Sequence, residues 1–115
     1  MSFEITKTFH KSIPILGLEG CLMDTNVFRF SRELKQLVKD GHIRIALDVS
    51  RADFFDSHAL GILVFHYTNM SKENRNLIII NNNSDPQAYM NGLFESTGLI
   101  NVFPVITNKE ALSSC

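Results

Sequence analysis

The spacing of apolar residues changes several times along the chain, and each change marks a new predicted element. Near the N-terminus apolar residues alternate with others, at Phe3, Ile5, Ile13 and Ile15 or at Leu16 and Leu18. A period of two is typical of strands, and residues 10–12 separate the two alternating runs. We therefore expect the chain to begin with a β-hairpin.

Between residues 25 and 40 the apolar spacing changes to three and four. The apolar positions are Val27, Phe30, Leu34, Leu37 and Val38. This spacing predicts an amphipathic helix, which Gly41 would end as a C′ residue. Basic residues occupy other positions of the helix: Arg29, Arg32, Lys35 and Lys39. A solvated helix face explains them most simply, and a partner-binding surface is the alternative.

The middle of the chain predicts a strand, a helix and a second strand. Residues 42–50 alternate, with apolar side chains at Ile43, Ile45, Leu47 and Val49. Residues 59–67 are almost all apolar, so their period does not separate helix from strand. The N-cap candidates Asp56 and Ser57 and the helix-compatible residues through Glu73 favour a buried helix. The unbroken run NLIII at residues 76–80 is typical of a strand buried on both faces.

The C-terminal third predicts a helix, a short edge strand and a last helical turn. Ser84 and Asp85 are cap candidates, Pro86 suits a first turn, and Gln87 completes a capping box. The core stripe of this helix is Met90, Leu93 and Phe94, and Gly98 ends it. Residues 102–106 include Pro104, which an edge strand tolerates. A final turn of helix is expected from Asn108.

The predicted order of elements is β-β-α-β-α-β-α-β-α. This alternation predicts an α/β fold with a mixed sheet of four to five strands, parallel in its central part. About four helices would lie mainly on one face of that sheet. With 115 residues the chain is most simply one domain, spanning residues 1–115.

Composition narrows the functional classes without naming one. The chain has 44% hydrophobic and 20% charged residues, as soluble globular proteins do. Its net charge of −1 argues against nucleic acid or an anionic membrane as the main partner. The N-terminus has no signal-peptide h-region, and no apolar run approaches the roughly 18 residues of a membrane span, so we expect a cytoplasmic protein. Cys21 and Cys115 form neither a disulfide framework nor a zinc motif, and we predict no metal and no cofactor.

Asp56, Ser57 and His58 contain the residue types of a serine-hydrolase triad, but adjacent residues cannot act as one. Side chains that follow each other at a helix start are splayed by about 100°, whereas a triad needs convergent groups. The chain also has no GxSxG, GxGxxG or Walker motif, and His66 has the apolar neighbours of a satisfied core histidine. We therefore predict no catalytic centre. Helix capping alone explains Asp56 and Ser57, and Phe54 and Phe55 would then form a hydrophobic staple or a strand end.

The residues around this triplet, VSRADFFDSHALGILVFHY, resemble the signature of STAS domains, the fold of bacterial anti-sigma factor antagonists. In that signature a strand runs into a helix start of the form D-S-x-G-L-G. Other segments resemble the family in the same order: residues 18–20, ALDVS, the TGL turn, a following phenylalanine-proline pair and a closing E-A-L. The resemblance covers nearly the whole chain and implies a STAS-like fold.

The resemblance also implies a function. The family places a phosphorylatable serine directly after the aspartate, and this position is Ser57. The unphosphorylated domain binds an anti-sigma factor that is also a serine kinase, the kinase ends the complex by phosphorylating the serine, and a PP2C-type phosphatase restores it. This cycle is called partner switching. The residues implied in partner binding are Asp24, Asp56, Ser57, His58, Leu60 and Gly61.

The sequence departs from the family pattern in three respects. His58 replaces a small or hydroxyl residue, and Ala59 replaces the first glycine of G-L-G. GCLM at residues 20–23 replaces G-E-L-D, so the usual acid is missing unless Asp24 supplies it from a shifted turn. The alternative function is a non-switching STAS scaffold or ligand module in a signalling or transport assembly. Ser57 and the absence of a membrane segment favour the antagonist.

Overall fold

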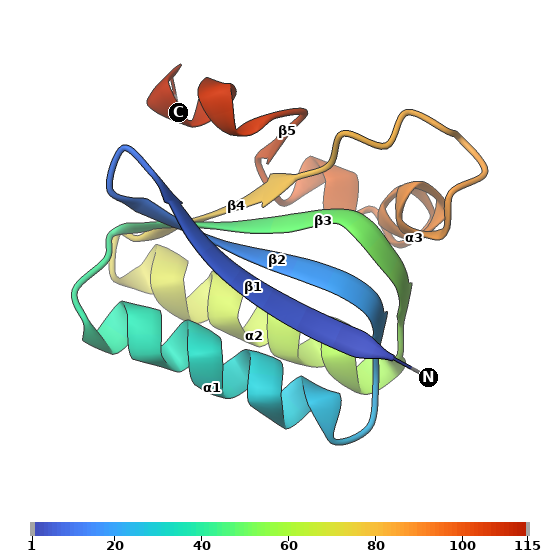
Figure 1. Ribbon diagram of the computed structural model, residues 1–115, viewed down its shortest axis with the longest axis horizontal. Coiled ribbons are helices and arrows are strands. Elements are labelled where there is room, and N and C mark those ends of the chain that lie inside the picture. The colour runs from blue at the N-terminus through green and yellow to red at the C-terminus, as the bar shows by residue number, and fades with distance from the viewer. Residues whose placement is uncertain (1, 115) are drawn as a thin grey trace.

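The computed structural model describes residues 2–114, in which five strands form one sheet in the order β1-β2-β3-β4-β5 (Figure 1). The strands are β1 (Phe3–His10), β2 (Ile13–Leu22), β3 (Arg44–Phe55), β4 (Asn76–Ile80) and β5 (Val105–Ile106). The α-helices are α1 (Asn26–Lys39), α2 (Ser57–Lys72) and α3 (Tyr89–Thr97), and two 3-10 helices are η1 (Leu99–Asn101) and η2 (Lys109–Ser114). β1 is antiparallel to β2, and the other neighbours are parallel. The predicted α/β fold with a mixed sheet and a parallel centre is confirmed.

Helices α1 and α2 lie side by side against one face of the sheet and enclose the main core (Figure 1). That core includes Leu18, Phe30, Leu34, Leu47, Leu63, Leu77 and Ile79. The opposite face has a smaller cluster, made of Ile13, Ile15, Ala46, Ile78, Ile80 and Leu112 of η2. Alternate side chains of β4 enter the two clusters, because successive residues of a strand point to opposite faces. This burial on both faces explains the unbroken apolar run of β4.

The predicted hairpin and the predicted end of α1 are both observed. Lys11 and Ser12 connect β1 to β2 with φ of 50° and 69°, and positive φ at both central residues matches the twist of paired strands. Gly41 follows α1 with φ of 95°. Glycine adopts this left-handed conformation without a steric penalty, so it can end the helix there.

Strand β3 is longer than its alternation predicts. It begins at Arg44 and continues five residues past Ser50 to Phe55. Residues 51–55 remain in the sheet because they pair with the end of β2, although two register irregularities interrupt the pairing. These irregularities and the polar side chains of the segment obscure its period in the sequence. Phe54 and Phe55 are therefore a strand end, which is one of the two predicted alternatives.

The predicted start of the third helix is wrong. Helix α3 begins at Tyr89, and its N-cap residue Ala88 provides no side-chain cap. Asp85 instead accepts a hydrogen bond from the Gln87 backbone N–H at 2.9 Å, and the Asn91 side chain donates to the Asp85 carbonyl at 2.6 Å. Polar side chains near a helix start often form such local turns in place of a cap. The predicted core residues Met90 and Phe94 are buried.

The C-terminal elements are shorter and tighter than predicted. Strand β5 has two residues, and Pro104 precedes it with its carbonyl accepting from the Ile79 N–H at 2.9 Å. The last helical turn is the 3-10 helix η2. The Arg44 guanidinium donates to the carbonyl of Leu112 and so joins η2 to the start of β3. Cys115 lies outside the described residues.

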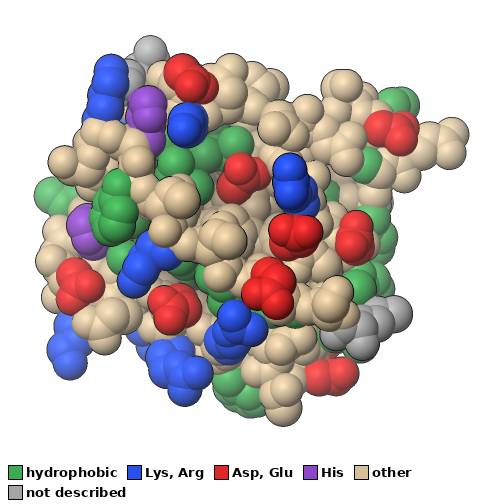
Figure 2. All heavy atoms as spheres, viewed as in Figure 1, with side chains coloured by type: hydrophobic (Ala, Val, Ile, Leu, Met, Phe, Trp, Pro, Cys, Tyr) green, Lys and Arg blue, Asp and Glu red, His purple; other side chains and the backbone are tan. Residues whose placement is uncertain are grey.

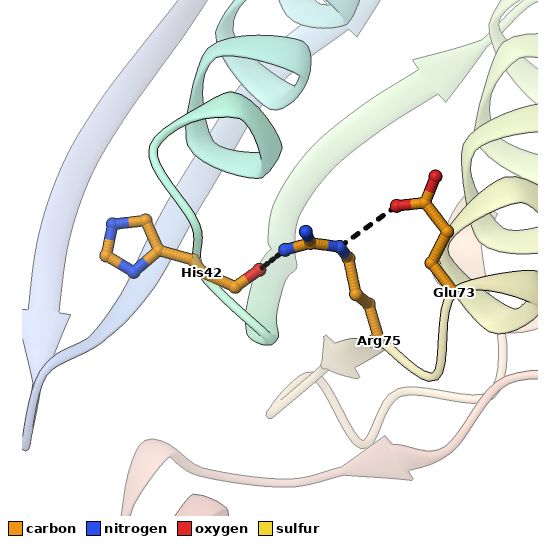
Figure 3. A network of polar contacts seen from close by, with 3 residues as sticks. All are labelled: His42, Glu73 and Arg75. Carbon is orange, nitrogen blue, oxygen red and sulfur yellow. Dashed lines mark hydrogen bonds and ion pairs between the residues drawn. The ribbon is translucent and has the colours of Figure 1, made fainter.

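Arg75 joins two helix-to-strand connections at the edge of the sheet where the parallel strands begin (Figure 3). Its Nη1 donates to the His42 carbonyl at 2.8 Å, and its Nε donates to Glu73 Oε1 at 3.1 Å. We expect Arg75→Ala to lower the free energy of unfolding by about 1–2 kcal/mol, because a charged donor to a half-buried carbonyl is lost. Urea denaturation measures this change.

Arg51→Ala is the matched control, because its side chain is 80% exposed and stands 4.0 Å from Glu19. An exposed pair of this kind contributes little, so the change should stay below about 0.5 kcal/mol. Equal effects of the two substitutions would show that the Arg75 contacts do not stabilise the fold.

Candidate functional site at the start of α2

Ser57 lies at the edge of the sheet where the parallel strands end. Strand β3 ends at Phe55, Asp56 is the N-cap residue, and Ser57 is the first residue of α2. Asp56 has extended backbone, and its Oδ1 accepts from the Ala59 N–H at 2.8 Å. Asp56 is therefore the cap that the sequence suggested. The Ser57 side chain is exposed, and its hydroxyl makes no hydrogen bond within residues 2–114.

Asp56 also holds the loop between β2 and α1. Its Oδ2 accepts from the Asp24 N–H at 3.2 Å, and its own N–H donates to the Leu22 carbonyl at 3.2 Å. Asp24 has φ of 54°, which turns the chain sharply before α1. The exposed Asp24 is thus brought next to the start of α2.

Two aromatic pairs lie near the start of α2, and each includes a residue of another helix, α1 or α3. The ring of His58 meets Phe28 of α1 edge-on, with centroids 5.3 Å apart. The ring of Phe54 contacts Tyr89 of α3, also at 5.3 Å, and Tyr89 Oη donates to the Phe55 carbonyl at 3.0 Å. Sequence reasoning missed Phe28 and Tyr89. Phe28 had a detectable signal, because it is a large apolar residue outside the apolar stripe of its helix.

The solvent side of α2 next to Ser57 carries no charge. Helix α2 contains no Asp, Glu, Lys or Arg before Lys72. Leu60, Gly61 and Val64 lie three, four and seven residues after Ser57, so all four residues share one face of the helix. Leu60 is half-buried, Gly61 is exposed, and a Cβ at Gly61 would meet no atom within 4 Å. Such an uncharged exposed face resembles the centre of protein interfaces, where charged residues are depleted.

The side chains of the three adjacent polar residues have different surroundings. The Asp56 carboxylate accepts backbone N–H groups, the Ser57 hydroxyl faces solvent, and the His58 ring packs on Phe28. This arrangement agrees with the geometric argument against a catalytic triad. Among the described residues, no three His, Cys, Asp or Glu side chains gather as metal ligands would.

His66 is the satisfied core histidine that the sequence predicted. Its ring is 5% exposed, and its Nε2 lies 2.8 Å from Ser31 Oγ. Burial lowers the pKa of His66, and the charge of Lys35 lowers it further. The imidazole is therefore held in its neutral form. None of the helices formed by residues 2–114 has the length and apolar composition of a membrane span.

The pKa of the Asp56 carboxyl is lowered, chiefly by the hydrogen bond from the Ala59 N–H and also by the Asp24 N–H and the charge of His58. Removal of this cap in Asp56→Ala should lower the free energy of unfolding by about 1–2 kcal/mol at pH 7. Because the folded pKa is lowered, this stabilisation is complete above the unfolded pKa and is lost as pH falls through the folded value.

The stability difference between wild type and Asp56→Ala should therefore shrink below about pH 4. Denaturation curves at neutral and acidic pH measure this trend. Asp56→Asn is the control, since it keeps an acceptor oxygen without the titrating charge and should lose less at pH 7. A difference that stays constant with pH would contradict the role of the ionised carboxylate.

The family model described as STAS domain matches residues 4–112, and the chain belongs to this family. Among its relatives is "Putative anti-sigma factor antagonist BtrV" of Bordetella bronchiseptica, 24% identical over 100 residues that cover 87% of this chain and 83% of that protein. The fold is also that of solved anti-sigma factor antagonists. The structure of one from Mycobacterium paratuberculosis has a TM-score of 0.80 at 21% identity, covering 98% of this chain and 93% of that one. The phosphorylated form of the Bacillus cell fate determinant SpoIIAA has a TM-score of 0.70 at 18% identity, with 98% of both chains covered.

Proposed function

We propose that this chain is an anti-sigma factor antagonist that acts by partner switching. With Ser57 unmodified, it binds an anti-sigma factor that is also a serine kinase, and phosphorylation of Ser57 ends the complex. The observation that carries this proposal is the exposed hydroxyl of Ser57, which stands at the first position of α2 without a role in capping. Relatives named as anti-sigma factor antagonists, and a STAS fold solved in a phosphorylated form, support it.

The surroundings of Ser57 suit a protein partner. Asp56 and His58 flank Ser57 in the chain, the Asp24 backbone N–H donates to Asp56, and Leu60 and Gly61 continue an uncharged surface along α2. Gly61 lets a partner approach the helix backbone closely, because no Cβ projects there. We assign these residues together with Ser57 as the partner-binding surface.

The structure also suggests how a phosphate would act. It would add about −1.5 to −2 charges at the N-terminus of α2, where the helix dipole favours an anion. Asp56 already occupies the Ala59 N–H, so the phosphate need not replace the cap. The charge of Asp56 opposes the phosphate and a protonated His58 would favour it, so the net effect on the fold is small. The switch then acts through the surface presented to the partner.

The first test is phosphorylation. Incubation with ATP and the serine kinases encoded near its gene should place one phosphate on Ser57, located by mass spectrometry of the intact protein and its peptides. Ser57→Ala should accept none, and a PP2C-type phosphatase should remove the phosphate from wild type. A phosphate on another residue would contradict the assignment of Ser57. The absence of any phosphate would favour a non-switching scaffold.

A further inference from the structure

The outer surface of the two helices α1 and α2 is hollowed along their line of contact. A hollow of about 310 Å³ lies between Val38 of α1 and the α2 residues Phe65 and Met70. A second hollow of about 430 Å³ lies on α1 between Phe28 and Lys39. Lys35 lines both, and Ser31 of the second hollow bonds His66 of the first. We call the two hollows together the α1–α2 trough.

The trough exposes large apolar side chains that a solvated helix pair would keep covered. Phe65 is 54% exposed and Phe28 is 63% exposed, although both belong to helices with buried faces. Below Phe65 the floor consists of Met70 and the neutral ring of His66, both nearly inaccessible to solvent. Exposed apolar side chains beside a hollow with a polar rim are typical of an interaction site.

The rim of the trough is basic. Arg32, Lys35 and Lys39 line it, and none of the three forms an ion pair within residues 2–114. Among the described residues lining the trough, Glu73 is the single acid, and Arg75 Nε holds it at 3.1 Å. Figure 2 shows Lys and Arg side chains at the lower left, where α1 lies in Figure 1, with Asp and Glu side chains between them. An acidic ligand would therefore meet uncompensated positive charge along one wall.

We propose that the α1–α2 trough binds an acidic amphipathic helix of a partner protein. An apolar side chain of that helix enters the hollow beside Phe65, and Asp or Glu residues on its flank pair with Arg32, Lys35 and Lys39. Helices that dock in grooves use this combination of apolar anchors and flanking charges. The hollow beside Phe65 has no lining residue in common with the partner-binding surface around Ser57, and Phe28 of the second hollow contacts His58 of that surface.

The concave shape favours a helix over a flat anionic membrane. A bilayer surface contacts protruding residues such as Phe28, but it does not fill a hollow of 310 Å³ whose floor is buried. A side chain projecting from a helix fills such a hollow and removes the exposed part of Phe65 from water. Burial of apolar area in this way favours binding.

The test uses two synthetic helical peptides of equal length with the same leucine face, one flanked by glutamates and the other by lysines. In NMR titrations of the full chain, the glutamate peptide should shift amide resonances of α1 and α2 around Lys35 and Phe65. The lysine peptide should bind at least about tenfold more weakly, because opposite charges across an interface set its specificity. Lys35→Glu should reduce this preference for the glutamate peptide by about tenfold or more.

Two matched control substitutions test whether peptide binding depends on the trough itself or on any change of charge or loss of an exposed ring. Lys72→Glu makes the same charge change on α2 outside the lining of the trough and should leave both affinities within about twofold of wild type. Phe9→Ala is the control for Phe65→Ala, because the Phe9 ring is 56% exposed and the Phe65 ring is 54% exposed. Only Phe65→Ala should weaken binding of the glutamate peptide. Equal binding of the two peptides, absence of binding, or shifts confined to other elements would overturn the proposal. Phe65-dependent binding to vesicles of anionic lipid without peptide binding would assign the trough to membranes instead.

Discussion

Ser57→Glu should weaken binding to the cognate anti-sigma factor kinase by at least about 100-fold while changing the free energy of unfolding by no more than about 1 kcal/mol. The substitution affects affinity more than stability, because the new carboxylate is solvated in the free protein and buried in the complex. In the free protein the added carboxylate is exposed, at the favourable end of the α2 dipole and beside an existing cap. In the complex it would be pressed against the partner on a helix face that carries no charge.

Removing that carboxylate from water without a compensating cation costs several kcal/mol, and each 1.4 kcal/mol is a factor of ten in affinity. Calorimetric titration measures the affinity, and urea denaturation measures the stability. Ser57→Ala should bind as wild type does while accepting no phosphate. Ser71→Glu places the same group on an exposed position at the other end of α2 and should keep the affinity. Undiminished binding by Ser57→Glu would refute a surface switch at this position.

Gly20→Ala should lower the free energy of unfolding by at least about 2 kcal/mol, since a side chain there meets both backbone strain and a backbone clash. Gly20 has φ of +93°, and a Cβ would lie 2.2 Å from the carbonyl oxygen of Ser2. That oxygen accepts from the Cys21 N–H at 3.1 Å, so relief of the clash also weakens this hydrogen bond. The loop that carries Asp24 begins two residues after Cys21, and its position beside Asp56 should loosen as well.

Gly92→Ala is the matched control for Gly20→Ala. Gly92 lies within α3, and a Cβ there would meet nothing within 4 Å. Alanine is the better helix former, so this substitution should stabilise the protein by up to about 1 kcal/mol. Thermal and urea denaturation of the two variants should therefore move in opposite directions. A Gly20→Ala protein as stable as wild type would mean that β1 and the end of β2 separate without penalty.

The part of the site that lies on adjacent residues could be predicted from the sequence. A short polar residue before a long apolar run predicts a helix cap, and Asp56 caps α2 through the Ala59 N–H. The same local rule failed at Ser84 and Asp85, where Asp85 bonds to Gln87 and Asn91 in a turn. Equivalent residue types therefore adopt two local structures, and α3 starts only at Tyr89, with Met90 and Phe94 buried.

Contacts between distant segments could not be predicted in the same way. Asp24 is 32 residues from Asp56, and the bond between them depends on how β2 and β3 end side by side. The contact of His58 with Phe28 likewise requires α1 and α2 to lie next to each other. The family resemblance led us to expect a small or hydroxyl residue at position 58, and the ring of Phe28 gives the imidazole of His58 an aromatic neighbour there.

The sequence by itself determined the order of helices and strands, the fold class and the helix start at Asp56, because period, capping and turn chemistry act between residues close in the chain. Its resemblance to the STAS family also singled out Ser57. Only the tertiary structure decided that β3 runs to Phe55, that Asp24 lies beside Asp56, and that exposed aromatic rings from α1 and α3 stand near the start of α2. Strand pairing and helix packing join segments far apart in the chain, and their geometry depends on the whole core rather than on any local pattern.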